Sequence, residues 1–321
     1  MATVAAEHPK MRAAQQSPKT VKVCYSVMDH FLPKCGVVDL TEGIHLGDPD
    51  ISFGQAPANQ HNYLLDQIGC EAGSRILDVG CGYGTLVARA RDRGATAVGI
   101  TLSREQVHRS RRAGLDVRLL DYKALGPEWN QSFDGLVANG SIEHYVQPQE
   151  ALAGRDDDIY RDFFERMHRA LDPQSGGRLA TTAIHFVRRP NPADLLRHPL
   201  AFPRGSAAFH YAILARSFGG WYPVRGQLER CAEGYFTLVD EVDGTDDYGR
   251  TSEEWLRRVR QALRSRTGIK IAISSLPTLL LHPLQFTTML VCMLVTESWN
   301  WQFRPPHPPT RLLRQIWQYV P

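Results

Sequence analysis

The chain has 321 residues, a formal net charge of +3, 43% hydrophobic residues and 22% charged residues. This composition is typical of a globular protein that is large enough to bury a full core, and so mild a charge argues against an obligate nucleic-acid binder. The six cysteines form no CxxC pair. We therefore expect reduced thiols, a cytoplasmic location and no metal site.

Neither end of the chain has the pattern of a targeting or membrane segment. Residues 1–20 mix charges and prolines without the apolar core of a secretory signal, so we predict a disordered tail. The most apolar run, 269–295, is interrupted by Lys270, Pro277 and Pro283, whereas a bilayer span needs about 20 mostly uninterrupted apolar residues. We expect helices packed on the core or on an apolar ligand.

Short β-rich runs alternate with helical runs through the middle of the chain. Such alternation predicts a parallel sheet with helices on both faces, the doubly wound α/β fold. The candidate strands are RILDV (75–79), AVGIT (97–101), VRLLD (117–121), FDGLVAN (133–139), RLATTAI (178–184) and YFTLVDEVD (235–243).

The first candidate strand leads directly into a glycine-rich turn, DVGCGYG, with glycines at 80, 82 and 84. Glycines between a strand and a helix let a ligand lie against the backbone. The spacing differs from that of a dinucleotide site, and Asp78 precedes the turn, which favours a nucleoside without phosphates. S-adenosylmethionine fits, because its ammonium group pairs with a nearby carboxylate.

Two further motifs, together with the one that contains the glycine turn, make the interpretation specific. The three motifs are ILDVGCGYG (76–84), VGITLSREQ (98–106) and FDGLVANGSIEHY (133–145). In the sequence, order and spacing of these motifs, the chain resembles the cyclopropane fatty acid synthase and mycolic acid cyclopropane synthase family, over roughly residues 60 to 262. The resemblance implies a class I S-adenosylmethionine-dependent methyltransferase with a seven-stranded, mostly parallel sheet.

The chain divides into four predicted parts beside this motif set. After the tail, residues 21–70 are predicted to be an N-terminal helical cap over the cofactor, and 71–267 the methyltransferase domain. Within the domain, residues 186–232 are rich in proline, aromatics and arginine, and so long an insertion is usually a lid or binding element. Residues 268–321 are predicted to be an apolar helical extension.

The cofactor contacts are expected along the carboxyl ends of the first four strands. Most class I methyltransferases carry an acidic residue after the second strand for the ribose, where this chain has Thr101. The resemblance implies that the TLS loop, Thr101 to Ser103, and Gln106 contact the cofactor instead. It also implies that Asp121 and Tyr122 lie near the adenine, although Asp121 could merely cap a turn. The expected cofactor-binding residues are Asp78, Gly80, Gly82, Gly84, Thr101, Leu102, Ser103, Gln106, Asp121, Tyr122 and Asn139.

The motif NGSIEHY follows the fourth strand at the edge of the sheet where open α/β folds bind their ligands. We expect Glu143 and His144 to face the reaction. Methyl transfer to an alkene leaves a carbocation, so the protein needs a dry pocket, aromatic faces and a base for one proton. The aromatic faces are expected from Tyr248 and from the lid residues Phe186, Phe202, Phe209, Tyr211, Trp221 and Tyr222.

In the family that the chain resembles, a bound bicarbonate is the base. The resemblance implies that Glu143 and Tyr248 correspond to two residues that hold it. The family cysteine falls near LTEGIHLGD, where Glu42 or a neighbour takes its place. The resemblance also implies that the family histidine corresponds to Thr182, with His185 displaced to the opposite face of the strand. These departures disfavour bicarbonate and favour a protein carboxylate as the base. The expected catalytic residues are Glu42, Glu143, His144 and Tyr248.

The acceptor stays open at this point. The apolar segment 269–295 favours an unsaturated lipid acyl chain or isoprenoid, with a methylated, methylenated or cyclopropanated product. An N-methyltransferase of a small amine is the alternative, because plant alkaloid N-methyltransferases resemble the same family. A non-catalytic scaffold is disfavoured by the retained glycines and Glu143. An arginine-rich helix near 257–266 leaves contact with a membrane surface open, and the sequence does not reveal the oligomeric state.

Overall fold

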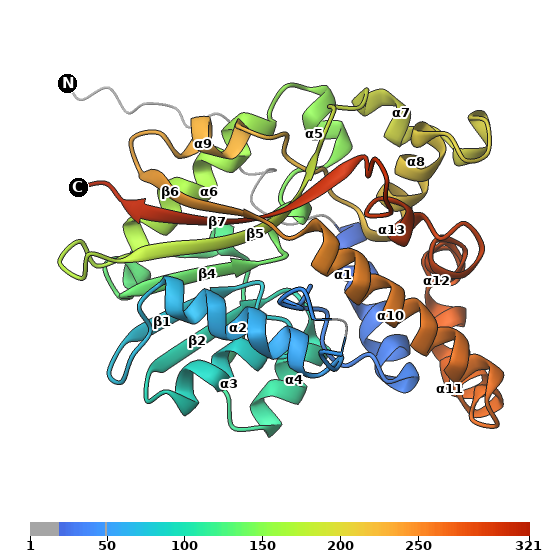
Figure 1. Cartoon of the computed structure of the whole chain (residues 1–321), viewed down its shortest axis with the longest axis horizontal. Coiled ribbons are helices and arrows are strands. Elements are labelled where there is room, and N and C mark those ends of the chain that lie inside the picture. The colour runs from blue at the N-terminus through green and yellow to red at the C-terminus, as the bar shows by residue number, and fades with distance from the viewer. Residues whose placement is uncertain (1–18, 49) are drawn as a thin grey trace, which may run out of the picture.

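A computed structural model of the chain describes residues 19–48 and 50–321, with only the backbone of Lys19 and Thr20. Seven strands form one sheet in the order β3-β2-β1-β4-β5-β7-β6 (Figure 1). Only β7 runs antiparallel to the other six strands, which confirms the doubly wound, mostly parallel fold. The strands are β1 (Arg75–Val79), β2 (Thr96–Thr101), β3 (Val117–Leu119), β4 (Gly135–Asn139), β5 (Arg178–Phe186), β6 (Phe236–Asp243) and β7 (Thr310–Tyr319).

The helices fall into three groups along the chain. Those before and between the parallel strands are α1 (Lys19–Phe31), α2 (Gln55–Gln67), α3 (Thr85–Asp92), α4 (Arg104–Arg112), α5 (Pro148–Leu152) and α6 (Asp156–Ala170). The segment predicted as a lid contains α7 (Pro192–Leu196), α8 (Ala207–Phe218) and α9 (Gln227–Ala232). After β6 come α10 (Thr245–Arg264), α11 (Gly268–Leu281), α12 (Pro283–Leu290) and α13 (Ser298–Trp301).

Helices cover both faces of the sheet, as the strand sequences require. Consecutive side chains of a strand point to opposite faces. Ile76 accordingly packs in a core cluster with Leu64 of α2 and Leu86 of α3, whereas Leu77 packs in the cluster that contains Phe163 and Phe164 of α6. The central strands β1 and β4 are therefore mostly apolar and buried, which is typical of a parallel sheet covered on both faces.

The strand β7 corrects the prediction that residues 268–321 are helical throughout. It pairs with β5 from Phe186↔Thr310 to Arg178↔Gln318, in the middle of that half of the sheet. Its Leu312 and Trp317 are fully buried. The polar residues at 311, 314, 315 and 318 interrupt its apolar positions, so the sequence lacks the regular alternation that marks a half-buried strand.

The structure can be compared with two further predictions, the N-terminal tail and the apolar segment near the C-terminus. Most of the predicted tail, residues 1–18, lies outside the described residues, and α1 already begins at Lys19. Residues 268–295 form α11, α12 and a π-helical turn, Val291–Val295, that pack near α1, α8 and α10 (Figure 1). Within the described part of the chain, none of the helices has the length and apolar content needed to cross a bilayer.

Candidate active site

Two adjoining cavities lie at the carboxyl ends of the parallel strands. The inner cavity, of about 130 Å³, extends from Asp78 to Glu143 and Tyr248. The strand-end cavity, of about 90 Å³, lies along Thr101 and Asp121. The residues that line both cavities are Tyr25, Gly80, Gly82, Gln106, Gly140 and His144.

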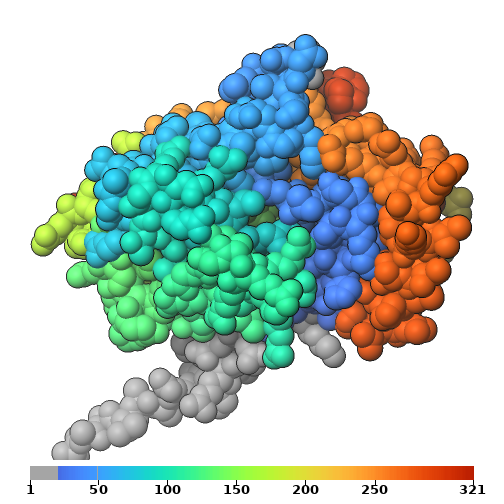
Figure 2. Space-filling view, turned by 90° about the horizontal axis from the view of Figure 1, so that it is seen from below, coloured from blue at the N-terminus to red at the C-terminus, as the bar shows by residue number. Residues whose placement is uncertain are grey.

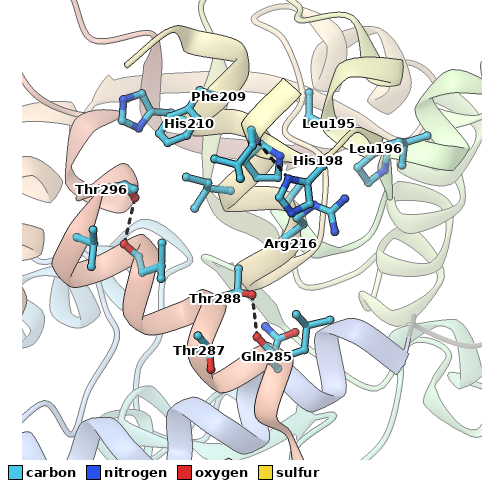
Figure 3. A pocket seen from close by; sticks show the side chains of 18 of the residues that line it. Leu195, Leu196, His198, Phe209, His210, Arg216, Gln285, Thr287, Thr288 and Thr296 are labelled. Carbon is cyan, nitrogen blue, oxygen red and sulfur yellow. Dashed lines mark hydrogen bonds between the residues drawn. The ribbon is translucent and has the colours of Figure 1, made fainter. Parts of the chain in front are cut away.

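A third hollow, the outer cavity, is larger, about 1120 Å³, and lies between the lid helices and α12 (Figure 3). It is lined by none of the residues expected to bind the cofactor or to catalyse the reaction. The candidate active site is therefore placed in the inner and strand-end cavities, because the residues that line them, and not their volumes, match the expected site.

The glycine turn lies open to both of these cavities at Gly82. Gly82 has a φ of +53°, and a Cβ atom there would meet nothing within 4 Å, so it would project into open space. Gly84 differs, because it lines neither cavity and a Cβ there would lie 3.0 Å from the Leu115 side chain. Gly82 thus leaves room for a ligand, whereas Gly84 leaves room for the packing of α3.

Asp78, the second-last residue of β1, is a buried carboxylate beside the glycine turn. Burial raises the pKa of Asp78 to about 7, and the negative charge of Asp39 adds to the effect. Within the described residues, no group donates a hydrogen bond to its side chain, which lines the inner cavity. A cationic ligand group would stabilise the charged form. This unpartnered carboxylate and the open space at Gly82 fit S-adenosylmethionine, whose amino group Asp78 would hold.

The TLS loop and the residues after β3 line the strand-end cavity as expected. Thr101 donates a 2.6 Å hydrogen bond to the side chain of Gln106, and Ser103 caps α4 by accepting from the Gln106 backbone at 3.3 Å. Asp121 both lines the cavity and caps the next turn, where its carboxylate accepts from the backbone of Lys123 at 3.1 Å. The expected contacts that line this cavity are Gly80, Gly82, Thr101, Leu102, Ser103, Gln106, Asp121 and Tyr122.

An acidic residue does reach the end of β2, but it comes from α1. The Asp29 carboxylate accepts hydrogen bonds from Ser103 (2.6 Å), Tyr83 (2.8 Å) and Gln106 (3.1 Å). Burial raises the pKa of Asp29, and these three donors oppose the rise. Asp29 therefore fastens α1 over the glycine turn and the TLS loop.

The helix α1 also positions His144, in the 3₁₀ turn Ile142–His144 after β4. The hydroxyl of Tyr25 and Nε2 of His144 share a 2.8 Å hydrogen bond, and the two rings meet edge to face. Burial lowers the pKa of His144 to about 4, so the imidazole is neutral at physiological pH. Tyr25 and His144 line both cavities, at the border between the expected cofactor side and the expected acceptor side.

Glu143 presents one free carboxylate oxygen in the site. Its Oε1 accepts a 2.7 Å hydrogen bond from the backbone of Ile184, whereas its Oε2 is buried and has no partner among the described residues. Burial raises the pKa of Glu143 to about 8, and Glu42 adds to the rise. A carboxylate with a pKa near neutrality and a free oxygen is suited to accept a proton.

Glu42 lies where the family cysteine was expected, and it is held by a polar network. It accepts hydrogen bonds from Gln60 and from the Thr182 hydroxyl, the latter at 3.1 Å. Burial raises the pKa of Glu42, and the nearby positive charge of Arg314 on β7 opposes the rise. Asn139, the last residue of β4, accepts from Gln60 at 2.8 Å.

Arg314 is the buried cation of this network, with 2% of its surface exposed. Its guanidinium donates to Gln60 (3.1 Å), to the Gly43 carbonyl (2.8 Å) and to Asp247 (3.1 Å). It therefore ties the loop that carries Glu42 to β7 and α10.

Aromatic side chains complete the inner cavity. Tyr248 lines it, and burial raises the pKa of its hydroxyl well above the usual range, so it stays protonated. Of the aromatic lid residues that the sequence suggested, only Tyr222 lines this cavity; Trp221, for example, is fully buried against Phe186. The further aromatic residues of the cavity are Tyr25, Tyr83, Phe218 and Trp299.

His185 lies away from the site, as the alternation of the strand predicts. Its Nδ1 is 2.9 Å from the Ala183 carbonyl, and it lines neither cavity. Thr182 was expected in place of the family histidine, and its hydroxyl lies 3.1 Å from the Glu42 carboxylate and 3.0 Å from Oδ1 of Asn139, to either of which it can donate. The described residues contain no cluster of three metal-ligating side chains.

The sequence reasoning missed Tyr25, Asp29, Gln60 and Arg314. Tyr25 and Asp29 are four residues apart on α1, and thus on one helix face, within the mainly apolar stretch VCYSVMDHF. That polar pair was a usable signal. Gln60 and Arg314 carried none, because their contact joins residues 254 positions apart.

Comparison with known proteins agrees with this geometry. Residues 44–270 match the family model described as mycolic acid cyclopropane synthetase. Cyclopropane mycolic acid synthase MmaA2 of Mycobacterium tuberculosis is 27% identical over 238 residues, which cover 72% of this chain and 76% of that protein. Cyclopropane mycolic acid synthase 3 of the same species is 28% identical over 239 residues, 70% of this chain and 75% of that protein.

Solved structures show the same fold. The cyclopropane synthase MmaA2 from Mycobacterium tuberculosis matches with a TM-score of 0.67 at 20% identity, over 94% of this chain and 99% of that one. Geranyl diphosphate C-methyltransferase from Streptomyces coelicolor A3(2), solved with geranyl diphosphate and S-adenosyl-L-homocysteine, matches with a TM-score of 0.56 at 17% identity, over 95% and 99%. The chain therefore belongs to the mycolic acid cyclopropane synthetase family.

Proposed function

We propose that this chain is an S-adenosylmethionine-dependent methyltransferase that alkylates a carbon of an unsaturated apolar acceptor, a lipid acyl chain or an isoprenoid. One observation carries the proposal: the unpartnered Oε2 of Glu143 lies at an aromatic cavity that adjoins the glycine turn. S-adenosylmethionine, when bound, supplies an electrophilic methyl group. Asp78, the TLS loop and Gln106 would hold it against the glycines.

The residues of the inner cavity are suited to control a cation on the acceptor. The alkene π electrons would form the new bond to the methyl carbon while the methyl–sulfur bond breaks and leaves its electron pair on the sulfur. A positive charge then remains on the neighbouring acceptor carbon. The rings of Tyr222, Tyr248 and Trp299 line the same cavity and can face this charge. Oε2 of Glu143 then accepts one proton, and the electron pair left behind closes a cyclopropane ring or a double bond.

Glu143 itself, rather than bicarbonate, is the base in this proposal. Glu42 lies where a family cysteine was expected, and burial, together with the negative charge of Glu42, already raises the pKa of Glu143. A third anion beside them would be repelled further. Turnover should therefore be the same in bicarbonate-free buffer under nitrogen as in air-equilibrated buffer. A loss of turnover that added bicarbonate restores would contradict this assignment.

The first test of the reaction uses methyl-labelled S-adenosylmethionine. Purified protein is incubated with unsaturated fatty acids, phospholipids, prenyl diphosphates and small amines, and label is followed by mass spectrometry. We expect a gain of one methylene unit on an alkene, and the remaining double bonds distinguish a ring from a methyl-alkene. Label on amines alone would replace the proposal by the N-methyltransferase alternative.

A matched pair of glycine variants tests the cofactor site. Gly82→Ala should weaken S-adenosylmethionine binding at least about tenfold, because its Cβ would occupy the space that adjoins both cavities. Gly114→Ala is the control: Gly114 also has a positive φ, +72°, and open space around it, but it lines neither cavity. Both variants carry a similar backbone strain. Equal affinities by calorimetry would contradict the proposed site.

The helix α11 suggests where such an enzyme contacts a membrane. Ile271, Ser275 and Thr278 face the core, while the opposite face is apolar and exposed, with Ile273 61% and Leu280 78% exposed. No acidic residue occurs between 265 and 296, and the exposed cations of the same region are Arg264, Arg266 and Lys270. Figure 2 shows these C-terminal helices, in orange, on one side of the molecule next to the blue N-terminal segment. We propose that this face binds an anionic bilayer surface from the cytoplasmic side.

A double variant, Ile273→Glu with Leu280→Glu, tests the membrane face. Vesicles that contain phosphatidylserine should sediment the parent protein more strongly than neutral phosphatidylcholine vesicles, and the double variant should stay in the supernatant. The control is Leu152→Glu, because Leu152 is 54% exposed on α5, outside this face. If the parent protein binds neither kind of vesicle but dimerises through α11, the face belongs to contact with a second copy of the chain. That result would overturn the proposal.

A further inference from the structure

The outer cavity has the chemistry of a binding site of its own. It lies between the lid and α12, and apolar side chains such as Leu195, Ile213 and Val291 form much of its lining. Figure 3 shows its labelled polar side chains, among them His198 and Arg216, between these two parts. A hollow of about 1120 Å³ that combines apolar walls with a few polar groups is typical of a site for a small molecule or a lipid chain.

The charge of this cavity has one sign. Of the described residues that line it, none is acidic, and two are arginines, Arg204 and Arg216. Neither guanidinium has an ion pair or hydrogen bond within the described residues, unlike Arg197 nearby, which lies 3.8 Å from Asp194. An arginine that has no partner and lies beside apolar side chains can bind a carboxylate or a phosphate, with which its guanidinium forms two parallel hydrogen bonds.

The outer cavity also lies directly behind the inner one. The end of α8 separates them, with Arg216 on the outer side and Phe218 on the inner side. Gln147 lines the outer cavity, and its side chain accepts from the backbone of Gly220 at 3.1 Å and donates to the His144 carbonyl at 3.1 Å. Gln147 and the end of α8 therefore connect the linings of the two cavities.

We infer that the outer cavity binds the anionic end of the acceptor, a carboxylate or phosphate on an apolar chain, through Arg204 and Arg216. The inference rests on the proposed function, because it makes the chain run from this end toward the inner cavity. It adds a second determinant of substrate choice: the inner cavity selects an alkene, and the outer cavity selects an anionic end group.

The test measures binding of unreactive probes to the full chain by calorimetry. Dodecyl phosphate should bind at least about tenfold more tightly than dodecanol, and dodecyltrimethylammonium more weakly than either. The double variant Arg204→Gln with Arg216→Gln should bind dodecyl phosphate no better than dodecanol, while its affinity for dodecanol stays the same. Arg197→Gln, with an arginine removed outside the cavity, should retain the preference.

Several outcomes decide the matter. Equal affinities for dodecyl phosphate and dodecanol, or a preference that survives the double variant, would overturn the inference. A separate experiment measures binding of the double variant to anionic vesicles. If the double variant no longer binds them, the anionic group belongs to a bilayer lipid. If vesicle binding is unchanged, the anionic group belongs to a soluble amphiphile. If the phosphate preference holds but no acceptor is ever methylated, the cavity assignment stands and the proposed reaction fails.

Discussion

Glu143→Gln should lower the rate of product formation about 10²- to 10⁴-fold, the usual contribution of a positioned general base. Glutamine preserves the shape of the side chain and can still accept from the backbone of Ile184, but it has no oxygen that can take a proton. S-adenosylmethionine affinity should change little, because Asp78 and the glycine turn are untouched. Single-turnover assays with labelled cofactor, and calorimetry for binding, measure the two quantities separately.

The pH dependence gives this prediction a second readout. The base must be deprotonated, and burial raises the pKa of Glu143 to about 8 in the free protein. The kcat/KM of the parent protein should therefore rise with pH through about 8, whereas the residual rate of the glutamine variant should lack this limb. A variant that keeps the parent rate would show that Glu143 is not the base. Glu42→Gln would then be the next variant to measure.

The same variant should be more stable than the parent protein at high pH. Below pH 4.5, the ordinary pKa of a glutamate, the carboxyl is protonated in both the folded and unfolded states. Between that value and about 8, the folded protein retains a proton that the unfolded chain releases, so stability falls as pH rises. Glutamine removes this loss. The Tm difference between variant and parent should be larger at pH 8 than at pH 5.

Arg314→Met should cost about 3–5 kcal/mol of folding free energy, the usual effect of removing one partner from a buried ion pair. Methionine has a similar volume but leaves Asp247, the Gly43 carbonyl and Gln60 without their donor. It also removes the cation that opposes the raised pKa of Glu42. Urea denaturation followed by circular dichroism measures the change.

Arg311→Met is the matched control on the same strand. Arg311 has 41% of its side chain exposed and lies 3.6 Å from Asp243, so its loss should cost no more than about 1 kcal/mol. A similar destabilisation by both variants would show that any arginine of β7 matters through the strand and not through the buried network. A stable Arg314→Met protein would contradict the structural role given to Arg314 here.

The parts of this protein that the sequence could predict are those encoded locally. The glycine turn, the TLS loop and the pair Glu143 and His144 each lie within a few residues of a strand end. The parallel topology brings these strand ends to one edge of the sheet. The doubly wound fold was predictable for the same reason and is confirmed. The catalytic and cofactor-binding roles of these residues stay predictions, which the variants above test.

What could not be predicted depends on distant contacts. Asp29 meets Ser103 across 74 residues, and Arg314 meets Gln60 across 254. Periodicity and propensity describe a segment against its own neighbours, so they say nothing about which distant element it will contact. The strand β7 was missed because the partners of its buried polar residues come from other parts of the fold. Arg314 donates to Gln60 and Asp247, and Nε2 of Gln315 donates to Glu241.

The position of β7 between β5 and β6 imposes an order on folding. The strand β6 forms its ladder with β7 alone, so it can join the rest of the sheet only through residues 310–319, which pair with β5. The parallel unit from β1 to β5 depends on no such late partner, whereas this step closes a loop of more than a hundred residues and is slow for that reason. Because Arg314 arrives on the same strand, a partly folded chain can carry a complete glycine turn while the loop of Glu42 is still unanchored. Cofactor-binding competence can thus precede catalytic competence as the protein folds.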